Sequence, residues 1–588
     1  MNIRRAILVS LFLLFTQSFS QLSGFDSFVE KELTAWKVPG AAIAIIKDGK
    51  VILMKGYGFA DVNNKRPVTT KTAFPIASVT KSFTVSTLAV LAKQGKLDWK
   101  TPVREYLPDF RLYDETLTAH ITPRDLVTHR SGLPRHDMAW YNSSLPREEL
   151  YQRLRYLEPS EDIRTAYQYN NFMFMTAGYL AGKLSGGTWE QAVAKYILTP
   201  VGMSSTTFTI ADLKKLPDYS LPYQKDDNDE VKEIGFQQLD AMGPTGSINS
   251  NVEDMVKYVA MHLNNGKHAD KEILLSSDVE QMRTPQMVIH SAMRYPELGH
   301  TQYGMGFVIT TYRGHKLVHH AGNMDGFASL VSMMPRENIG IVILTNLDGN
   351  PLRMIFSYNI YDRFLGLNQI GWSKRFMDAE AKDKATEDDA KKQGLTAKRP
   401  GTRPSHTIDE YAGEYEHPAY GAVAIESAGG DSLRMTFHDF KTALHHFHYD
   451  VFETPQNKLN RLERTKVMFN SDWDGEVSSL SISMQSGVKD IVFARVPEKV
   501  MKSREFLQPL AGQYDLGSSV VSVMLRDDNV LVMSIPGQSP YELLPVRGAK
   551  FNLKGMSGYS VEFKRNQSGV VTDVAFYQPD GNYVAKRR

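Results

Sequence analysis

The sequence predicts an α/β sandwich, in which helices flank one antiparallel sheet and a helical subdomain lies beside it, followed by two small all-β domains. Strand-like segments stand at both ends of residues 25–365, and mostly helical segments lie between them. One sheet assembled from both ends of this region is the simplest way to bury the apolar strands. Beyond residue 405 the chain is rich in short alternating segments and repeats a short pattern, which indicates two similar β modules.

The first predicted elements are a hairpin and a helix. Residues 41–46 form an apolar run, Asp48 and Gly49 supply a turn, and residues 51–54 return as a second strand. Residues 78–95 carry apolar side chains at helical spacing and end at a glycine, which predicts a helix. Later strands are predicted at residues 316–319, 329–334 and 340–344, and a later helix at 351–365.

The C-terminal third begins with a change of composition. Charged residues and alanine dominate residues 372–405, and prolines close this stretch, which predicts a charged helix and a linker. The two β modules open with similar sequences, Tyr-Ala-Gly-Glu-Tyr at 411–415 and Leu-Ala-Gly-Gln-Tyr at 510–514. We therefore expect an α/β domain at 21–371, the linker at 372–405, and β domains at 406–500 and 501–588.

The composition argues against several classes of function. Hydrophobic residues make up 42% of the 588 residues and charged residues 23%, which is ordinary for a globular protein. The net charge is +2 and no long basic run occurs, so nothing indicates a nucleic-acid partner. The chain contains no cysteine, which removes disulfides, thiolate-zinc sites, thiol nucleophiles and lipid attachment to cysteine.

Residues 1–20 predict a cleavable signal peptide. Two arginines precede an apolar run at residues 6–15, and the small residues Ser18 and Ser20 stand just ahead of Gln21. The run is too short for a stable membrane span, and no later segment has the about 18 unbroken apolar residues that a span needs. The alternatives are an uncleaved anchor and a buried N-terminal helix. We expect a secreted or periplasmic protein without a membrane span.

A pattern typical of activated serines occurs twice, whereas the esterase pattern G-x-S-x-G is absent. Ser78 and Lys81 open a predicted helix, where residues three apart share a face, so the lysine amine can lie beside the serine hydroxyl. The helix N-terminus also favours negative charge developing on the serine oxygen. Ser486 and Lys489 lie in a glycine-containing stretch between predicted strands, and we attribute this second match to chance.

Two further motifs follow Ser78 and Lys81 in order. They are Tyr169-Asn170-Asn171 and His320-Ala321-Gly322, supported by the stretches at 121–134 and 246–248. Over residues 25–365 the chain thereby resembles the serine β-lactamase and DD-peptidase superfamily, specifically the group of class C β-lactamases, D-amino-acid peptidases and related esterases. The resemblance implies a β-lactamase/transpeptidase-like fold and a covalent acyl-enzyme formed without metal or cofactor.

The resemblance also implies catalytic roles. Ser78 would attack the substrate carbonyl. Tyr169, as phenolate or through a proton shared with Lys81, would take the serine proton and return it to the leaving group. Which of Lys81 and Tyr169 is the base stays open. Tyr167 is a rival for Tyr169, but the asparagine two positions beyond Tyr169 favours Tyr169.

Substrate-binding roles follow in the same way. Asn171 would hold Lys81 and a substrate amide, Gly322 and His320 would line the site, and the backbone N–H groups of Ser78 and Asn323 would form the oxyanion hole. His320 stands where β-lactamases usually have lysine. An unperturbed histidine is about one tenth charged at pH 7.5, which predicts weak activity on carboxylate-bearing substrates unless a nearby arginine supplies the charge.

Metal binding by histidine clusters is a weaker interpretation. His319 and His320 are adjacent on a predicted strand, so their side chains point to opposite faces. His446 and His448 would share a face, but no further ligand is obvious nearby. We expect no metal site.

We therefore expect a serine hydrolase that cleaves amide or ester bonds, with peptides bearing D-residues or small esters as substrates. The alternatives are a true β-lactamase and a penicillin-binding sensor that is acylated without turnover. The β domains resemble modules often fused to this hydrolase group. As small lipocalin-like barrels they would hold an apolar ligand, cover the active site or join copies into a homo-oligomer.

Overall fold

The computed structural model describes residues 21–290, 293–392, 398–430, 432–473, 475–517, 519–527 and 529–588. The predicted signal peptide lies outside the described residues. The chain divides into two compact units: the first runs to Lys398 and includes Gln456–Glu463 and Met484–Lys489, and the second holds the rest. Within the described ranges, no helix combines the length and the apolar character that a membrane span requires.

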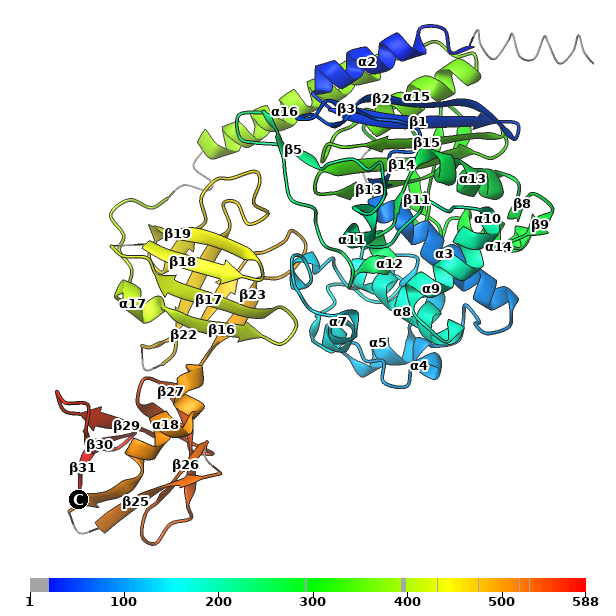
Figure 1. Cartoon of the computed structure of the whole chain (residues 1–588). Coiled ribbons are helices and arrows are strands. Elements are labelled where there is room, and N and C mark those ends of the chain that lie inside the picture. The colour runs from blue at the N-terminus through cyan, green and yellow to red at the C-terminus, as the bar shows by residue number, and fades with distance from the viewer. Residues whose placement is uncertain are drawn as a thin grey trace, which may run out of the picture. The chain divides into compact units, whose positions relative to one another are not determined.

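The first unit is built on an antiparallel sheet whose strands come from both ends of its sequence (Figure 1). The predicted hairpin is present as β1 (Gly40–Lys47) and β2 (Lys50–Asp61), and Asp48 and Gly49 take the positive φ angles of its turn. β1 also pairs with β15 (Ile339–Thr345), which joins the two ends of the region and confirms the predicted sandwich. In the described part of the chain the sheet order is β10-β11-β12-β13-β14-β15-β1-β2-β3. The other strands of this sheet are β3 (Arg66–Pro67), β10 (Met287–Ile289), β11 (Thr301–Tyr303), β12 (Val308–Tyr312), β13 (His315–Met324) and β14 (Phe327–Met334).

Helices cover both faces of this sheet, which explains why the central strands β14 and β15 are buried at every position. On β15, Ile341 and Ile343 belong to one core with α2 (Phe25–Trp36) and α15 (Leu352–Phe364). The neighbouring Gly340 faces Val259 of α13 (Val252–Leu263). Because successive strand residues point to opposite faces, α13 covers the face that α2 and α15 leave open.

The helical part of the unit lies between the two groups of strands in the sequence. α3 (Thr80–Lys93), α8 (Asn171–Ser185) and α12 (Gly243–Gly246) pack against one another and carry the residues described below. The other helices around them are α4 (Val103–Tyr106), α5 (Glu115–His120), α6 (Pro123–Leu126), α7 (Arg147–Arg153), α9 (Trp189–Val193), α10 (Thr199–Val201), α11 (Ile210–Leu213) and α14 (Ser276–Met282). Short hairpins and bridges are made by β4 (Phe74–Pro75), β5 (Tyr223–Lys225), β6 (Val231–Glu233), β7 (Asn249–Ser250), β8 (Lys267–His268) and β9 (Lys271–Glu272).

The domain boundary placed at residue 371 needs correction. The charged helix is present as α16 (Trp372–Lys392), but its first residue is only 1% exposed and belongs to the core of the sheet domain. The Trp372 indole donates a hydrogen bond to Tyr312 Oη at 3.1 Å and packs 4.7 Å from the Tyr358 ring. The α/β domain therefore continues into α16, because a buried indole of this size fills space that the domain cannot leave empty.

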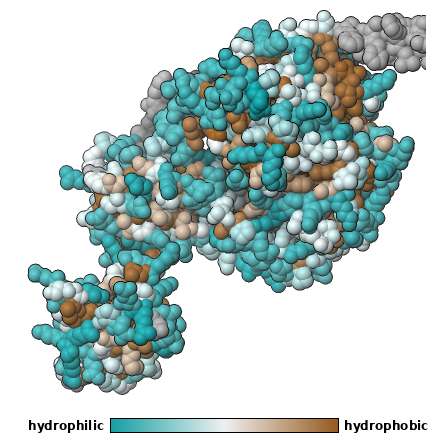
Figure 2. All heavy atoms as spheres, viewed as in Figure 1, coloured by the Kyte–Doolittle hydropathy of each residue, from teal (hydrophilic) through white to brown (hydrophobic). Residues whose placement is uncertain are grey.

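The second unit holds the two predicted β domains. β16 to β23 close into one barrel and β24 to β31 into another, over the residues that the structure describes, which confirms the predicted fold class. Buried and exposed positions alternate along strands such as β17 (Gly421–Ser427), and Figure 2 shows a mixed hydrophilic and apolar outer surface. The first barrel also has β16 (Gly413–His417), β18 (Ser432–Phe437), β19 (Phe440–His448), β20 (Val451–Glu453), β21 (Lys466–Ser471), β22 (Val477–Ile482) and β23 (Ile491–Val496). The second has β24 (Gly512–Leu516), β25 (Ser519–Arg526), β26 (Val530–Ser534), β27 (Tyr541–Arg547), β28 (Lys550–Leu553), β29 (Ser560–Arg565), β30 (Val571–Gln578) and β31 (Gly581–Arg587).

The repeated sequence at the start of each barrel makes the same contacts twice. Tyr415 Oη donates to the carbonyl oxygen of Tyr411 at 2.8 Å, and Tyr514 Oη donates to that of Leu510 at 2.7 Å. An arginine from the last strand of each barrel, Arg495 or Arg587, donates to the carbonyl of the alanine between them. The repeat therefore encodes the closure of each barrel.

Candidate active site

Ser78 lies in a tight turn at the start of α3. A 3₁₀ turn, Ala77–Val79, leads directly into the helix, so the N-terminal end of α3 adjoins the serine. Ala77 has a φ of 47°, which is a left-handed conformation that residues with a Cβ rarely adopt. Strain of this kind persists where the surrounding structure holds the backbone in place, and it clusters at functional sites.

Lys81 reaches back from the first turn of α3 to the serine. Its Nζ lies 3.1 Å from Ser78 Oγ and 2.9 Å from the carbonyl oxygen of Thr245. The side chain is fully buried, and Nζ lies 4.9 Å from the centre of the Tyr169 ring. Burial, and then the positive charge of Arg135, lower the pKa of Lys81 well below its ordinary value. The amine beside Ser78 is therefore biased towards its uncharged form.

Tyr169 approaches the serine from another segment. Its Oη donates a hydrogen bond to Ser78 Oγ at 2.8 Å. Burial raises the pKa of Tyr169 to about 12, although the hydrogen bond with Ser78 and the charge of Arg135 act in the opposite direction. The phenol therefore keeps its proton at neutral pH. Tyr167 packs instead against the rings of His129 and Tyr303, so the structure brings Tyr169 to the serine.

The segment that carries Tyr169 is held by His129, a residue whose contribution the sequence did not reveal. The backbone N–H of Asn170 donates to His129 Nδ1 at 3.1 Å, and that of Gln168 donates to the His129 carbonyl at 2.8 Å. The Asn170 side chain caps α8 by accepting from the N–H of Met173 at 2.9 Å. Tyr169 therefore lies between two fixed backbone positions.

The end of β13 packs directly on the serine turn. A Cβ built on Gly322 would lie 2.3 Å from the Ile76 carbonyl oxygen and 2.2 Å from Ser329 Oγ, so only glycine fits there. Ser329 Oγ donates to the same Ile76 oxygen at 2.7 Å. Gly322, the residue before Asn323 on β13, therefore lies directly against the turn that holds Ser78.

Two predicted binding residues have surroundings that differ from the expectation. Asn171 Nδ2 donates to Asp137 Oδ1 at 2.9 Å, and this contact takes the place of the one expected with Lys81. His320 is only 3% exposed, its Nδ1 lies 2.8 Å from the Ala321 carbonyl and its Nε2 lies 3.1 Å from Tyr303 Oη. Since a carbonyl only accepts, Nδ1 carries the proton and Nε2 accepts from the tyrosine.

The expectation that His320 titrates as an unperturbed histidine is therefore wrong. Burial is the main cause that lowers the pKa of His320 to about 3, so the imidazole is neutral at any ordinary pH. The expected rise in preference for carboxylates as pH falls through about 6.5 has no physical basis at this residue.

An arginine that follows the resembling stretch at 121–134 lies at the site. Arg135 Nε donates to Asp137 Oδ2 at 2.7 Å, and its Cζ lies 4.8 Å from the centre of the Tyr169 ring. In the sequence, the position of Arg135 directly after Pro134 indicates that it is near the site, but the sequence does not show which way its side chain points. Arg135 supplies the nearby positive charge that the sequence left open.

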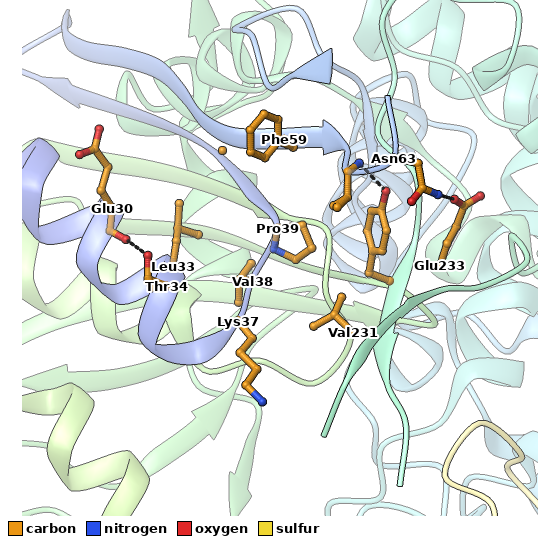
Figure 3. Close-up of a pocket in the computed structure, with 13 residues that line it drawn as sticks. Glu30, Leu33, Thr34, Lys37, Val38, Pro39, Phe59, Asn63, Val231 and Glu233 are labelled. Atoms are coloured by element: carbon orange, nitrogen blue, oxygen red, sulfur yellow. Dashed lines mark hydrogen bonds between the residues drawn. The ribbon is translucent and has the colours of Figure 1, made fainter. Parts of the chain in front are cut away.

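The remaining candidates do not belong to the constellation around Ser78, although Gln485, the residue before Ser486, accepts a hydrogen bond from the Asp137 N–H at 2.9 Å. Ser486 and Lys489 lie in the connection between β22 and β23, where Gly487 has a φ of 79°, and they do not share a helix face. Across the described ranges, no group of three or more His, Asp or Glu residues is arranged to hold a metal ion. A pocket of about 490 Å³ between α2, β2 and the β5–β6 hairpin is lined by Leu33, Phe59 and Val231 (Figure 3) and includes none of the predicted site residues.

Comparisons with known proteins agree with this geometry. The family model described as Beta-lactamase matches residues 25–357, and the model described as Domain of unknown function (DUF3471) matches residues 397–495. The chain is 28% identical over 427 residues to unguisins hydrolase ungD' of Aspergillus campestris (strain IBT 28561), which covers 68% of this chain and 77% of that protein. It is 28% identical over 327 residues to protein flp of Staphylococcus aureus (strain MW2), covering 55% of this chain and 62% of that protein.

A solved structure extends the comparison of the fold. The octameric penicillin-binding protein homologue from Pyrococcus abyssi aligns with a TM-score of 0.54 and 22% identity, over 80% of this chain and 99% of that one. The Beta-lactamase model spans more than half of the chain, and its range includes Ser78, Lys81, Tyr169 and His320. The chain therefore belongs to the Beta-lactamase family and is a serine hydrolase of that family.

Proposed function

We propose that the chain hydrolyses amide or ester bonds through an acyl-enzyme formed on Ser78. The observation that carries this proposal is the convergence of two proton-transfer groups on one hydroxyl. Lys81 Nζ lies 3.1 Å and Tyr169 Oη 2.8 Å from Ser78 Oγ, both within hydrogen-bond reach.

The states of the two groups support a division of roles in the first step. Uncharged Lys81 accepts the proton of Ser78 as Oγ attacks the substrate carbonyl. The backbone N–H groups of Ser78 and Asn323 stabilise the oxyanion of the tetrahedral intermediate. Tyr169 donates its proton to the departing amine or alcohol and recovers one from Lys81, so the acyl-enzyme forms with no net change in bound protons.

The second step reverses these transfers with water as the nucleophile. Lys81 and Tyr169 take a proton from the attacking water and return one to Ser78 Oγ as the acyl group leaves.

Peptides with D-residues and small esters are the proposed substrates, because the three motifs match the group of peptidases and esterases named above. The similar protein from Aspergillus campestris, 28% identical over 427 residues, is itself named as a hydrolase.

Turnover separates this proposal from an acylated sensor. A sensor needs only a nucleophile, whereas two proton-transfer groups beside Ser78 favour deacylation as well. A chromogenic ester should give steady turnover after any burst, and D-Ala-D-Ala peptides, D-aminoacyl amides and nitrocefin compared in parallel identify the substrate class. A stoichiometric burst with no later turnover on any of them would establish the sensor instead.

Export and assembly are separate proposals. We infer export from residues 1–20, and expect the protein recovered from outside the cytoplasm to begin at Gln21 by N-terminal sequencing. A start at Met1 in that fraction would contradict cleavage. Assembly through the β domains is tested by light scattering of the whole chain, and a monomer at all concentrations would contradict it.

A further inference from the structure

Arg135 presents an unused hydrogen-bonding edge beside the proposed nucleophile. Its Nε donates to Asp137, and its guanidinium lies over the Tyr169 ring, with Cζ 4.8 Å from the ring centre. Within the described part of the chain, neither Nη atom donates to a side chain or to the backbone. The side chain is 47% exposed, so the two Nη groups are open to a ligand.

Asp137 fixes the direction of this edge. Its Oδ2 accepts from Arg135 Nε at 2.7 Å, and its Oδ1 accepts from Asn171 Nδ2 at 2.9 Å and from Trp140 Nε1 at 3.1 Å. The carboxylate is only 14% exposed and is held from three directions. With Asp137 at one edge and an aromatic ring on one face, the guanidinium is oriented before any ligand arrives.

Other positive groups of the cluster are already engaged. Lys81 is fully buried and hydrogen-bonded to Ser78 and Thr245, and low pKa favours its neutral form. His320 is buried and neutral. Arginine stays charged and offers parallel N–H donors at the spacing of two carboxylate oxygens. The geometry around Ser78 therefore offers a carboxylate receptor at Arg135.

We propose that Arg135 is a specificity-determining residue whose free Nη edge binds a carboxylate in the leaving-group half of the substrate. The proposal rests on the acyl-enzyme function proposed above. Tyr169 protonates the leaving group in that scheme, and Arg135 lies against the ring of the same tyrosine, which places the carboxylate on the leaving-group side. The preferred substrates are then peptides with a free terminal carboxylate, and this carboxylate is bound by Arg135, in the loop after Pro134, and not by His320.

Paired substrates test this directly in the full chain. A D-Ala-D-Ala peptide with a free carboxylate and the same peptide with a terminal amide differ only in the group that Arg135 binds. The ratio of kcat/KM for acid over amide should fall about ten- to a hundredfold in Arg135→Gln, the range expected for one charge-assisted hydrogen-bonded contact. Arg135→Lys should retain part of the preference, because lysine keeps the positive charge but lacks the two parallel N–H donors of the guanidinium. Arg104→Gln, which removes a surface arginine paired with Glu115, is the matched control.

A binding measurement separates failure of this proposal from failure of the proposed reaction. Calorimetric titration of both peptides into Ser78→Ala and Ser78→Ala/Arg135→Gln requires no turnover. Tighter binding of the acid in Ser78→Ala, lost in the double variant, supports the receptor even if wild type turns over neither peptide. Equal binding of acid and amide, absence of binding, or an acid preference that survives Arg135→Gln overturns it. Turnover retained by Ser78→Ala would contradict the proposed reaction alone.

Discussion

Lys81 Nζ lies 3.1 Å from Ser78 Oγ, and its other hydrogen bond goes to the backbone carbonyl of Thr245 and not to a carboxylate. A buried ammonium without a direct counter-ion is strongly disfavoured, so the structure stabilises the free amine. This relationship links the stability of the fold to the reaction, because Lys81, the group proposed to activate the serine, also destabilises the folded state when it is charged.

Replacing Lys81 with methionine should therefore stabilise the protein while abolishing its activity. The pKa of Lys81 is lower in the folded than in the unfolded state, so the unfolded state binds more protons between these two values, and wild-type stability rises with pH there. Lys81→Met removes this penalty, by about 1.4 kcal/mol for each unit of pKa shift removed. Denaturant unfolding at pH 6 and pH 9 measures it, with the exposed Lys489→Met as control. A loss of stability that is equal at both pH values would contradict a neutral Lys81.

Removing the hydroxyl of Tyr169 should lower turnover by at least about a hundredfold, the scale of a lost proton-transfer group. The double variant Lys81→Met/Tyr169→Phe should lose little more than the worse single variant, because the two groups act as a unit. Tyr169 has a pKa of about 12, so wild-type kcat/KM should rise with pH as Lys81 deprotonates and stay level to about pH 10. Single losses that multiply in the double variant, or a fall in rate near pH 8, would argue against this scheme.

Adding a methyl group at Gly322 should damage the site more than the fold. The new Cβ would meet the Ile76 carbonyl at 2.3 Å, which pushes β13 away from the Ser78 turn. We expect Gly322→Ala to lower kcat/KM by more than about tenfold and stability by about 1–3 kcal/mol. Gly371→Ala is the control, because its Cβ would meet no atom within 4 Å. Activity equal to wild type in Gly322→Ala would show that this contact does not position the oxyanion hole.

Trp372 should contribute strongly to the stability of the α/β domain although it lies outside the region predicted from sequence. Trp372→Ala should lower the free energy of unfolding by about 3–5 kcal/mol, as expected for a fully buried indole. Trp473 is fully exposed, so Trp473→Ala is a matched control that should change stability by less than about 0.5 kcal/mol. Equal effects of the two substitutions would contradict the extension of the domain into α16.

Local patterns predicted the parts of the site that depend on local geometry. The spacing of three residues places Lys81 beside Ser78, and the turn at Asp48 and Gly49 determines the first hairpin. The charge of His320 depends instead on its burial beneath Tyr303, which no neighbouring residue in the sequence reveals.

The same limit applies to contacts between distant segments. Asn171 bonds Asp137 and not Lys81 because the loop carrying Arg135 and Asp137 reaches the first residue of α8, a tertiary contact with no periodic signal in the sequence. Trp372 begins a segment whose composition is that of a solvated helix, and only its packing against Tyr312 and Tyr358 shows that it belongs to the core.

Intact mass spectrometry after reaction with a fluorophosphonate probe tests the central claim most directly. Wild type and Ser486→Ala should each gain one adduct at the same rate, and peptide mapping should locate it on Ser78. Ser78→Ala should gain none, while a circular dichroism spectrum like that of wild type shows that it is folded. Labelling of Ser78→Ala at the wild-type rate, or an adduct mapped to another residue, would contradict Ser78 as the nucleophile.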